Sequence, residues 1–455
     1  MSDDLTDPAE RDAADAVYAS LLGRVGEANP RPRLEPTRRA VELLGDPQRA
    51  APVIHIAGTN GKSSTSRIVE SILTAHELRV GTLTSPHLER FTERIRIDGA
   101  PISDEAVVRN WEDIEPYIGM VDAELEGRGE LPLTYFEVLT VLAFAAFADA
   151  PVDVVVLEVG MGGEWDSTNV ADGQVAVFTP IDLDHQARLG STIEAIARTK
   201  SGIVKPTARV VSAKQRPEAL AVLEEAAALT ESTLAVEDRD FGVIESRVAV
   251  GGQLISVRGL AGEYRELLLP LFGRHQAENA AVAIAAVESF LGAGSVALSA
   301  EVLEAGLAAA TSPGRLQPIA QEPTVLVDAA HNPHGAHALV QALDEYFDFE
   351  HLVIVLAVVA DKDAAGIARE LAATGAQFIV TQSESDRALP ADELAAIVAA
   401  AAGPERVAIE EHPADALDAA RRIAEERGGA VLVTGSIVLV GEALAIADDH
   451  GWGRE

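Results

Sequence analysis

The chain has 455 residues, of which 48% are hydrophobic and 24% charged, a balance typical of a globular protein with two or more domains. Its 72 acidic residues against 36 basic ones give a formal charge of −36, which argues against broad contact with nucleic acid or an anionic membrane. Because cysteine is absent, disulfides, zinc thiolates and thiol nucleophiles are excluded.

The start of the chain, MSDDLTDPAE, is acidic and lacks the apolar core of a signal peptide. The longest apolar run, from Val138 to Ala148, is about half of the roughly 20 residues that a membrane helix needs. We therefore expect a cytoplasmic protein with no nucleic acid or membrane partner.

Apolar strand-like runs alternate with alanine-rich helical stretches, which predicts an α/β fold with a largely parallel sheet. Between residues 234 and 269, short alternating segments indicate a small β insertion of antiparallel hairpins. The proline-rich stretch at 311–318 is typical of a linker, so we expect domains at 1–310 and 319–455. Strands are expected at 53–57, 154–159, 175–179, 209–212, 324–327, 352–357, 378–381 and 431–434.

The first of these strands leads into a glycine-flanked lysine in VIHIAGTNGKSST, residues 53–65. In the common phosphate loop a glycine stands five residues before the Gly-Lys pair; here that position is Ile56, and the glycine is displaced to Gly58. Free N–H groups at the start of the next helix would bind phosphate oxygens, with Lys62 adding a charge. The segment predicts ATP or GTP binding, and a plain glycine turn is the alternative.

Polar residues follow later strands at the same expected sheet edge. Glu158 ends the strand in VVVLEVGMGGEWDSTN, where a carboxylate can hold Mg²⁺ beside a phosphate loop or merely cap the strand. His185 follows the next strand, and His331 with Asn332 follows a strand of the second domain. Lys200 ends the helical segment TIEAIARTK, where a cation also complements the helix dipole.

These motifs together resemble one family, the bifunctional dihydrofolate synthases and folylpolyglutamate synthases, which are relatives of the Mur peptide ligases. The resemblance runs through almost the whole chain, in the order HIAGTNGKSS, TSPHLERFTERI, TYFE, EVGMGGEWDSTN, DHQARLG, KSGIVK, FGRHQAENA, PGRLQ, DAAHNPHG, VADKD and TGSIVLVGEA. It implies an N-terminal ATPase domain of the P-loop type and a smaller, Rossmann-like C-terminal domain that binds glutamate.

The resemblance also implies the reaction. ATP would phosphorylate a carboxylate of dihydropteroate or of a reduced folate, and the amino group of L-glutamate would attack the acyl phosphate. ADP and phosphate would leave. The site would lie between the two domains of a monomer.

Roles for individual residues are implied in the same way. The ATP-binding residues would be Gly58, Thr59, Asn60, Gly61, Lys62, Ser63, Ser64, Asn279, Arg315 and Asp328. Mg²⁺ would be held at two sites by Ser85, Glu158, His185 and Lys200, the last as a carbamate formed with CO₂. The pterin side would be lined by Thr134, Tyr135, Phe136, Glu137, Trp165, Asp166 and Ser167. His331 and Ser436 would lie on the glutamate side, and the catalytic residues would be Lys62, Lys200 and His331.

Several positions depart from the family pattern. Ser63 replaces a glycine of GTNGKGS, and Glu164 stands where the family usually has arginine in GGRWDATN. Thr199 and Ser201 replace the glutamate and alanine of EKAGI. These changes leave the ATPase machinery plausible and bear on the pterin and folate preference.

Two other functions fit part of the sequence. A Mur-type ligase acting on a nucleotide-linked peptide usually has an extra N-terminal domain, whereas about fifty residues precede the phosphate loop here, at the lower limit for a domain. The TYFE and TSPHL segments also favour folate. A non-catalytic ATP-binding protein would have kept the fold alone, but every expected metal and phosphate position is present.

Overall fold

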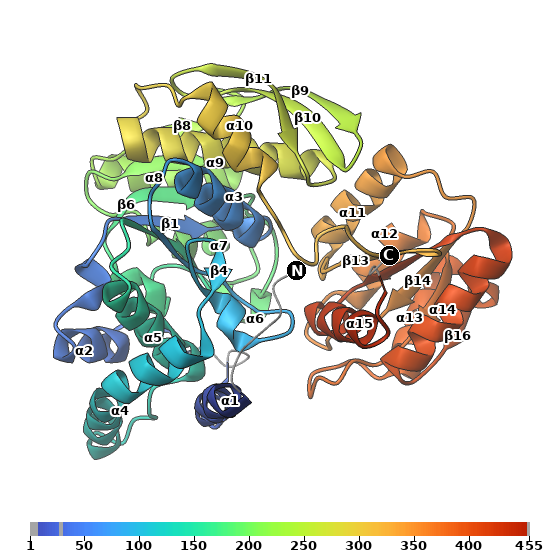
Figure 1. Cartoon of the computed structure of the whole chain (residues 1–455), viewed down its shortest axis with the longest axis horizontal. Coiled ribbons are helices and arrows are strands. Elements are labelled where there is room, and N and C mark those ends of the chain that lie inside the picture. Colours follow the sequence, from blue (N-terminus) through green and yellow to red (C-terminus); the bar gives the residue numbers. More distant parts are fainter. Residues whose placement is uncertain (1–7, 27–30, 453–455) are drawn as a thin grey trace. The chain divides into compact units, whose positions relative to one another are not determined.

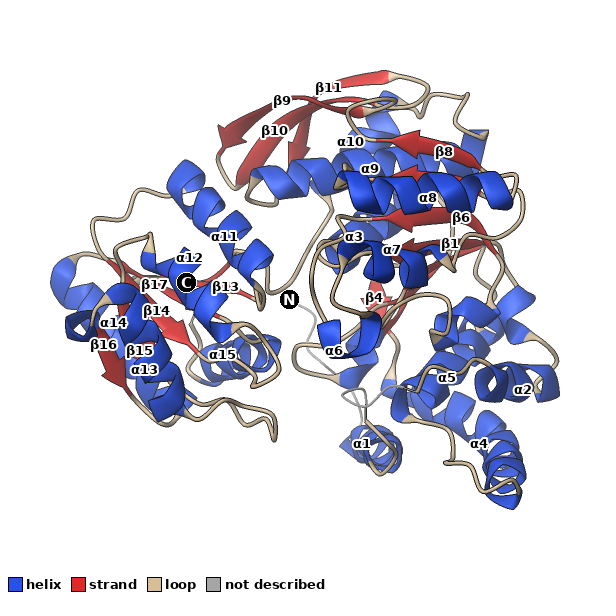
Figure 2. Ribbon diagram, turned by 180° about the vertical axis from the view of Figure 1, so that it is seen from behind, coloured by secondary structure: helices blue, strands red, loops and turns tan. Residues whose placement is uncertain are grey.

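Three β-sheets organise the computed structural model, which describes residues 8–26 and 31–452 (Figures 1 and 2). The chain forms two units. The first contains the described residues up to Glu245 together with Ile255–Leu267 and Glu278–Ala310. The second contains Ser246–Leu254, Leu268–Ala277 and the described residues from Thr311 onward.

The first unit contains the largest sheet. Its strands are β1 (Val53–Ala57), β2 (Val80–Leu83), β3 (Ile95–Ile97), β4 (Ala100–Pro101), β5 (Val154–Glu158), β6 (Gly173–Phe178), β7 (Arg209–Ser212) and β8 (Thr233–Val236), in the order β4-β3-β2-β5-β1-β6-β7-β8. Neighbours from β2 to β8 pair in parallel, and β3 and β4 add an antiparallel edge. Every residue of β1 and β5 is buried, as in parallel strands covered on both faces.

Helices alternate with these strands and lie on both sides of the sheet (Figure 2). They are α1 (Pro8–Leu22), α2 (Glu35–Leu43), α3 (Lys62–Ala75), α4 (Asp104–Gly127), α5 (Tyr135–Asp149), α6 (Gln186–Leu189), α7 (Ile193–Ser201), α8 (Pro217–Leu229), α9 (Arg274–Gly292) and α10 (Ala300–Ala308). The predicted α/β fold of the ATPase part is thereby confirmed.

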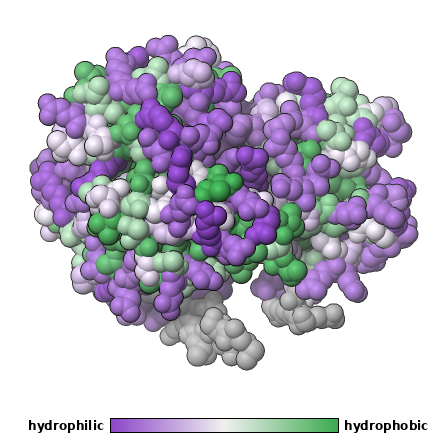
Figure 3. Space-filling view, turned by 90° about the horizontal axis from the view of Figure 1, so that it is seen from above, coloured by the Kyte–Doolittle hydropathy of each residue, from purple (hydrophilic) through white to green (hydrophobic). Residues whose placement is uncertain are grey.

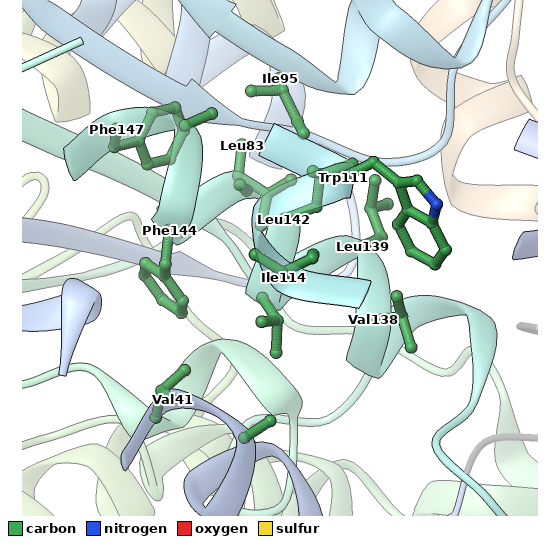
Figure 4. Packing of buried hydrophobic residues seen from close by; sticks show 14 of the residues in the cluster. Val41, Leu83, Ile95, Trp111, Ile114, Val138, Leu139, Leu142, Phe144 and Phe147 are labelled. Carbon is green, nitrogen blue, oxygen red and sulfur yellow. The ribbon is translucent and has the colours of Figure 1, made fainter. Parts of the chain in front are cut away.

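A large hydrophobic core lies where α4 and α5 pack against the sheet (Figure 4). The helix α5 is apolar around most of its circumference, because it packs against neighbours on several sides. The core side chains labelled in Figure 4 are Val41, Leu83, Ile95, Trp111, Ile114, Val138, Leu139, Leu142, Phe144 and Phe147. The apolar run from Val138 to Ala148 is therefore part of a core helix.

The second unit is built on a six-stranded sheet. Its strands are β12 (Gln317–Gln321), β13 (Thr324–Asp328), β14 (Leu352–Leu356), β15 (Gln377–Val380), β16 (Val407–Ile409) and β17 (Ala430–Thr434), in the order β12-β13-β17-β14-β15-β16. Only β12 is antiparallel to its neighbour. The helices are α11 (Pro333–Tyr346), α12 (Ala364–Ala372), α13 (Ala391–Ala402), α14 (Pro413–Arg427) and α15 (Ile437–Asp449). This alternation is the Rossmann-like arrangement that was expected.

The third sheet comprises β9 (Gly242–Ala249), β10 (Gly252–Arg258) and β11 (Glu263–Leu269), in the order β11-β10-β9. It starts later than the predicted residue 234, because β8 pairs in parallel with β7 in the large sheet instead. Parts of this segment belong to the second unit, where Gln253 donates hydrogen bonds to the carbonyl oxygens of Leu271 (2.9 Å) and Gly273 (3.0 Å). The hydroxyl of Tyr346 in α11 donates to Gln253 Oε1 at 3.1 Å. These bonds explain why the first unit is not the continuous segment 1–310.

The linker expected at 311–318 is also shorter in the structure. Gln317 and Pro318 already belong to β12, where they pair with Val327 and Leu326 of β13. A proline is tolerated there because β12 is an edge strand and proline lacks only the N–H donor.

The face shown in Figure 3 is largely hydrophilic, with smaller apolar patches. Within residues 8–26 and 31–452, no helix combines the length and the apolar character needed to cross a membrane.

Candidate active site

The phosphate loop joins β1 to α3 and is shaped by two glycines. Gly61 has φ of +85°, and a Cβ atom there would approach Asn279 Oδ1 to 2.6 Å. Gly58 lies so close to the side chain of Thr179 that no Cβ atom would fit. Only glycine combines this backbone with this close approach. The structure therefore places Asn279 against the loop.

The other loop residues are held from the neighbouring strand end. Thr59 N donates to Pro180 O at 2.9 Å, and the Thr59 hydroxyl bonds to the backbone of Asp182 at 3.0 Å. Lys62 begins α3, and its Nζ donates to Thr59 O at 3.3 Å. The N–H groups of the first helical turn have no partner within the helix, which makes the loop suited to phosphate oxygens.

Glu158, at the end of β5, lies beside this loop. Its carboxylate accepts hydrogen bonds from the Ser63 hydroxyl (3.0 Å) and from Ser85 N (3.4 Å). The side chain is only 1% exposed. β5 lies between β2 and β1 in the sheet, so the carboxyl ends of three parallel strands bring Ser85, Glu158 and Ser63 together. Such a set of oxygen donors fits Mg²⁺.

Lys200 is buried on α7 and reaches the same loop. Its Nζ donates to Gly58 O at 2.8 Å. Burial, reinforced by the positive charge of Lys62, lowers the pKa of Lys200 to about 7, against the opposing effect of Asp184 and Asp166. A large share of this amine is therefore neutral near pH 7, which is the form that attacks CO₂.

His185 occupies a strained position between β6 and α7. It has φ of +50° at the start of α6, and its Nε2 lies 3.9 Å from Asp184 Oδ2. Among the described residues, no group of three or more histidine, aspartate or glutamate side chains is arranged to hold a metal ion. A metal at this edge would therefore need serine oxygens or a modified lysine besides Glu158.

The glycine-rich loop after β5 packs on α7. A Cβ atom at Gly163 would meet Lys200 O at 2.7 Å, and Glu164 N donates to Thr199 O at 2.8 Å. The buried carboxylate of Asp166 turns back to accept from Met161 N at 2.9 Å. The ring of Phe136 packs against the same loop at Gly160, where a Cβ atom would lie 2.7 Å from it. Ser167 bonds to Thr140 at 2.9 Å.

Other predicted pterin-side residues are engaged in structural contacts. Thr134 and Glu137 form a capping box at the start of α5, and Glu137 also accepts two bonds of 2.9 Å from Arg33. Tyr135 is buried in the core and lies under the Arg94 guanidinium at 5.3 Å. The Trp165 ring packs near Gly162, where a Cβ atom would lie 3.0 Å from it. Of the predicted pterin-side residues, Phe136, Trp165, Asp166 and Ser167 thus lie in or against the glycine-rich loop.

Two of the departures from the family pattern, Glu164 and Thr199, lie where this loop packs on α7, whereas Ser63 bonds to Glu158 beside the phosphate loop and Ser201 is buried. Glu164 is exposed, and its Cβ rests against Gly202. The Thr199 hydroxyl donates to Ala195 O within its own helix at 3.3 Å. The reversed charge of Glu164 therefore faces solvent.

In the second unit, the loops after β13 and β17 lie side by side, since Gly435 N donates to Ala330 O at 3.1 Å. Asp328 accepts from Leu316 N and Ala330 N, both at 2.9 Å, and burial raises its pKa against the charge of Arg315. His331 Nδ1 donates to Ala329 O at 2.9 Å. Ser436 caps α15. Asp328, His331 and Ser436 thus share one sheet edge within this unit.

Sequence reasoning overlooked two charged residues of the first unit. The charge of Asp184 opposes the lowering of the Lys200 pKa. Arg67 follows Ser63 by one helical turn on α3; burial, with the charge of Arg96, lowers its pKa to about 10, against the carboxylates of Glu70, Glu93 and Glu158. Within the described residues, the Arg67 side chain forms no hydrogen bond or ion pair. The TPIDLDHQ segment contained a signal for Asp184, because it follows a strand at the phosphate edge. No sequence pattern distinguished Arg67.

Family models match both parts of the chain. The Mur ligase middle domain matches residues 56–287, and the Mur ligase, glutamate ligase domain, matches residues 314–437.

Individual relatives are similar over most of their length. A dihydrofolate synthase/folylpolyglutamate synthase from Mycobacterium tuberculosis is 44% identical over 91% of this chain and 90% of the relative. The protein of that name from Escherichia coli is 35% identical over 79% and 80%. The structure of Mycobacterium tuberculosis folylpolyglutamate synthase complexed with ADP has a TM-score of 0.92 and 43% identity, covering 96% of this chain and 99% of that one. E. coli FolC in complex with DHPP and ADP has a TM-score of 0.83 and 31% identity, covering 96% and 98%.

Proposed function

Because this chain belongs to the dihydrofolate synthase/folylpolyglutamate synthase family of Mur ligases, we propose that it joins L-glutamate both to dihydropteroate and to the glutamate tail of reduced folates. The chain is an ATP-dependent carboxylate–amine ligase. An acyl phosphate links the two half-reactions: a carboxylate oxygen attacks the γ-phosphorus of ATP, ADP leaves, and the glutamate amine then displaces phosphate. The carboxylate is a poor electrophile, and phosphorylation supplies the leaving group.

The observation that carries this proposal is the meeting of Lys200, Glu158 and Lys62 around one phosphate loop. Two anions, ATP and a carboxylate, must approach each other there, and a protein with a formal charge of −36 provides no general attraction for them. Local cations therefore have to offset the repulsion. Lys62 and the N–H groups of the loop would bind the ATP phosphates, with Asn279 beside Gly61.

Mg²⁺ fits the oxygen donors at this edge. Glu158 with Ser63 and Ser85 would hold one ion, with His185 as a further candidate. The bound cation would neutralise charge that develops on the transferred phosphoryl group.

A second metal position would depend on modification of Lys200. The neutral Nζ lone pair attacks the carbon of CO₂, and the amine proton leaves to solvent, which gives a carbamate anion with two oxygens. The pKa of about 7 for Lys200 favours this reaction, because the neutral amine is abundant at physiological pH. Arginine would stay charged and would not serve.

Different residues are candidates for contacting the acceptor and for contacting the incoming glutamate. Phe136, Trp165, Asp166 and Ser167 would contact the pterin-linked acceptor, while Thr134, Tyr135 and Glu137 would support α5 beneath them. In the second unit, Arg315 and Asp328 would contact ATP, and His331 and Ser436 would serve the glutamate side. Exclusion of water would protect the acyl phosphate from hydrolysis. A monomer and a cytoplasmic location stay predictions.

The test is phosphate release from ATP by the purified protein with Mg²⁺ and L-glutamate. Dihydropteroate, tetrahydrofolate and no acceptor are compared, and the amide product is identified by mass spectrometry. Stimulation of phosphate release by both acceptors supports the bifunctional proposal. Stimulation by only one acceptor would limit the activity to that acceptor. No stimulation by either acceptor would contradict it.

A further inference from the structure

A buried hydrogen-bonded network links the strand before the phosphate loop to the glycine-rich loop. The ring of His55, in the middle of β1, bonds through Nε2 to the hydroxyl of Thr168 at 2.8 Å. That hydroxyl donates to Asp166 Oδ1 at 2.6 Å. His55 and Thr168 are completely buried, and Asp166 is 4% exposed. We call these three residues the His55–Thr168–Asp166 network.

The direction of each bond follows from the groups present. Asp166 accepts three donors, which are Thr168 N (3.0 Å), Met161 N (2.9 Å) and the Thr168 hydroxyl. Burial raises the pKa of Asp166, and these hydrogen bonds oppose that effect because they stabilise the charged carboxylate. The single hydroxyl proton of Thr168 is used toward Asp166, so the hydroxyl can only accept from His55. His55 must therefore carry its proton on Nε2.

The rest of the His55 ring agrees with this assignment. Its Nδ1 is buried and has no hydrogen-bond partner among the described residues, as suits the unprotonated nitrogen of a neutral ring. Burial lowers the pKa of His55 to about 3, and the nearby charge of Lys205 adds to this effect. A neutral histidine with one fixed tautomer is a directional donor that contributes no charge.

We propose that His55 is a positioning residue for the acceptor site, where it acts through Thr168 to fix the carboxylate of Asp166. Asp166 lies in the glycine-rich loop that packs on α7, and its charge acts on Lys200. The network thus ties the position of the glycine-rich loop to β1, the strand that leads into the phosphate loop. This inference rests on the proposed function, because it needs Asp166 to face the pterin-linked acceptor.

The kinetic test uses matched pairs of variants. Thr168→Val removes the hydroxyl at constant shape, and Thr168→Ser keeps it; His55→Leu removes the donor, and His55→Gln keeps an N–H. We expect Thr168→Val and His55→Leu to raise the KM for dihydropteroate about tenfold, with the KM for ATP unchanged within about twofold. The serine and glutamine variants should recover most of the loss. Thr82→Val is the control, since the Thr82 hydroxyl is equally buried in β2 and has no hydrogen-bond partner in the described part of the chain.

An unchanged acceptor KM in Thr168→Val would overturn the proposal. An equal rise of the KM for dihydropteroate in Thr168→Val and Thr168→Ser would also overturn it. So would a matching rise in the KM for ATP, since either result would indicate general damage to the fold. Wild-type turnover is measured first, and its absence with both acceptors overturns the proposed function itself.

A second measurement needs no activity. In protein labelled with ¹⁵N-histidine, we expect the His55 ring to show the Nε2–H tautomer at pH 7, with a slowly exchanging proton. The signal should be lost in His55→Gln and shifted in Thr168→Val, but not in Thr82→Val. An Nδ1–H tautomer would overturn the network whatever the kinetic outcome.

Discussion

Lys200 Nζ donates a 2.8 Å hydrogen bond to the carbonyl oxygen of Gly58, across 142 positions of sequence. The bond anchors the end of α7 to the first residue of the phosphate loop. It also places a second amine near Lys62, whose charge helps to lower the pKa of Lys200. A chemical change at Lys200 would therefore directly affect the backbone of the phosphate loop.

Replacing Lys200 with alanine should lower kcat by about 100-fold, because the site loses the anion that the carbamate would supply. Short-chain acids such as acetate should restore part of the activity by placing a carboxylate in the space. Lys200→Arg should be as inactive and should gain nothing from acetate. The measurement is phosphate release with and without acid, with the exposed Lys214→Ala as control. Full activity of Lys200→Ala would contradict the carbamate.

Replacing Lys62 with alanine should abolish ATP-dependent amide formation, a loss of at least about 100-fold, because the loop loses the charge that would offset the ATP phosphates. The fold should persist, since Lys62 is partly exposed and its side chain, among the described residues, bonds only to Thr59 O. Product formation and circular dichroism are measured together. Unchanged turnover would refute the assignment of this loop.

Glu158→Gln should raise the Mg²⁺ concentration needed for half-maximal activity by about 10-fold or more, because an amide oxygen carries no charge for the cation. Titration of activity with Mg²⁺ measures this shift. The exposed Glu304 on α10 provides the matched Glu→Gln control. The same Mg²⁺ requirement in both variants would mean that Glu158 only supports Ser63 and Ser85.

The buried His55 should make the first unit sensitive to acid. Its pKa is about 3 in the folded chain and about 6.5 when unfolded, so protons bind preferentially to the unfolded state between these values. Its contribution to stability is complete above pH 6.5 and is lost as the pH falls toward 3. At pH 5 the loss is about 2 kcal/mol.

The change in thermal unfolding midpoint between pH 7.5 and pH 5 measures this loss. It should be smaller in His55→Gln than in the wild type, and equal changes would contradict the prediction. Glu237 acts with the opposite sign, since burial raises its pKa to about 7, but it is present in both proteins and cancels in the comparison.

The fold was largely predictable because the buried parallel strands are short apolar runs. VIHIA and VVVLE are buried at every residue and were recognised as strands. The shorter strands at and near the sheet edges are absent from the expected ranges, and so is β2 in the interior of the large sheet. β3 and β16 have only three residues each, and β4 has two, so their apolar pattern is too short to detect. Their pairing depends on neighbours that are distant in sequence.

The placement of candidate site residues beside one another was predictable where a motif stands at the carboxyl end of a strand. Gly58, Lys62 and Glu158 are of this kind, because the end of a parallel strand fixes where the next residues lie. The partner of Glu137 could not be inferred, since Arg33 reaches it from a segment with no motif. The same holds for Arg67 and for the bond between His55 and Thr168, which joins residues 113 positions apart.

The sequence passes from one unit to the other at residues 245/246, 254/255, 267/268, 277/278 and 310/311. No single cut of the polypeptide therefore yields both halves intact, and a fragment ending at residue 310 would carry Gln253 without its partner Tyr346. A chimaera of two homologues joined at one of these positions would combine residues from different proteins within one unit. The two units therefore have to be exchanged or redesigned together, because both contribute residues to the sheet of β9, β10 and β11.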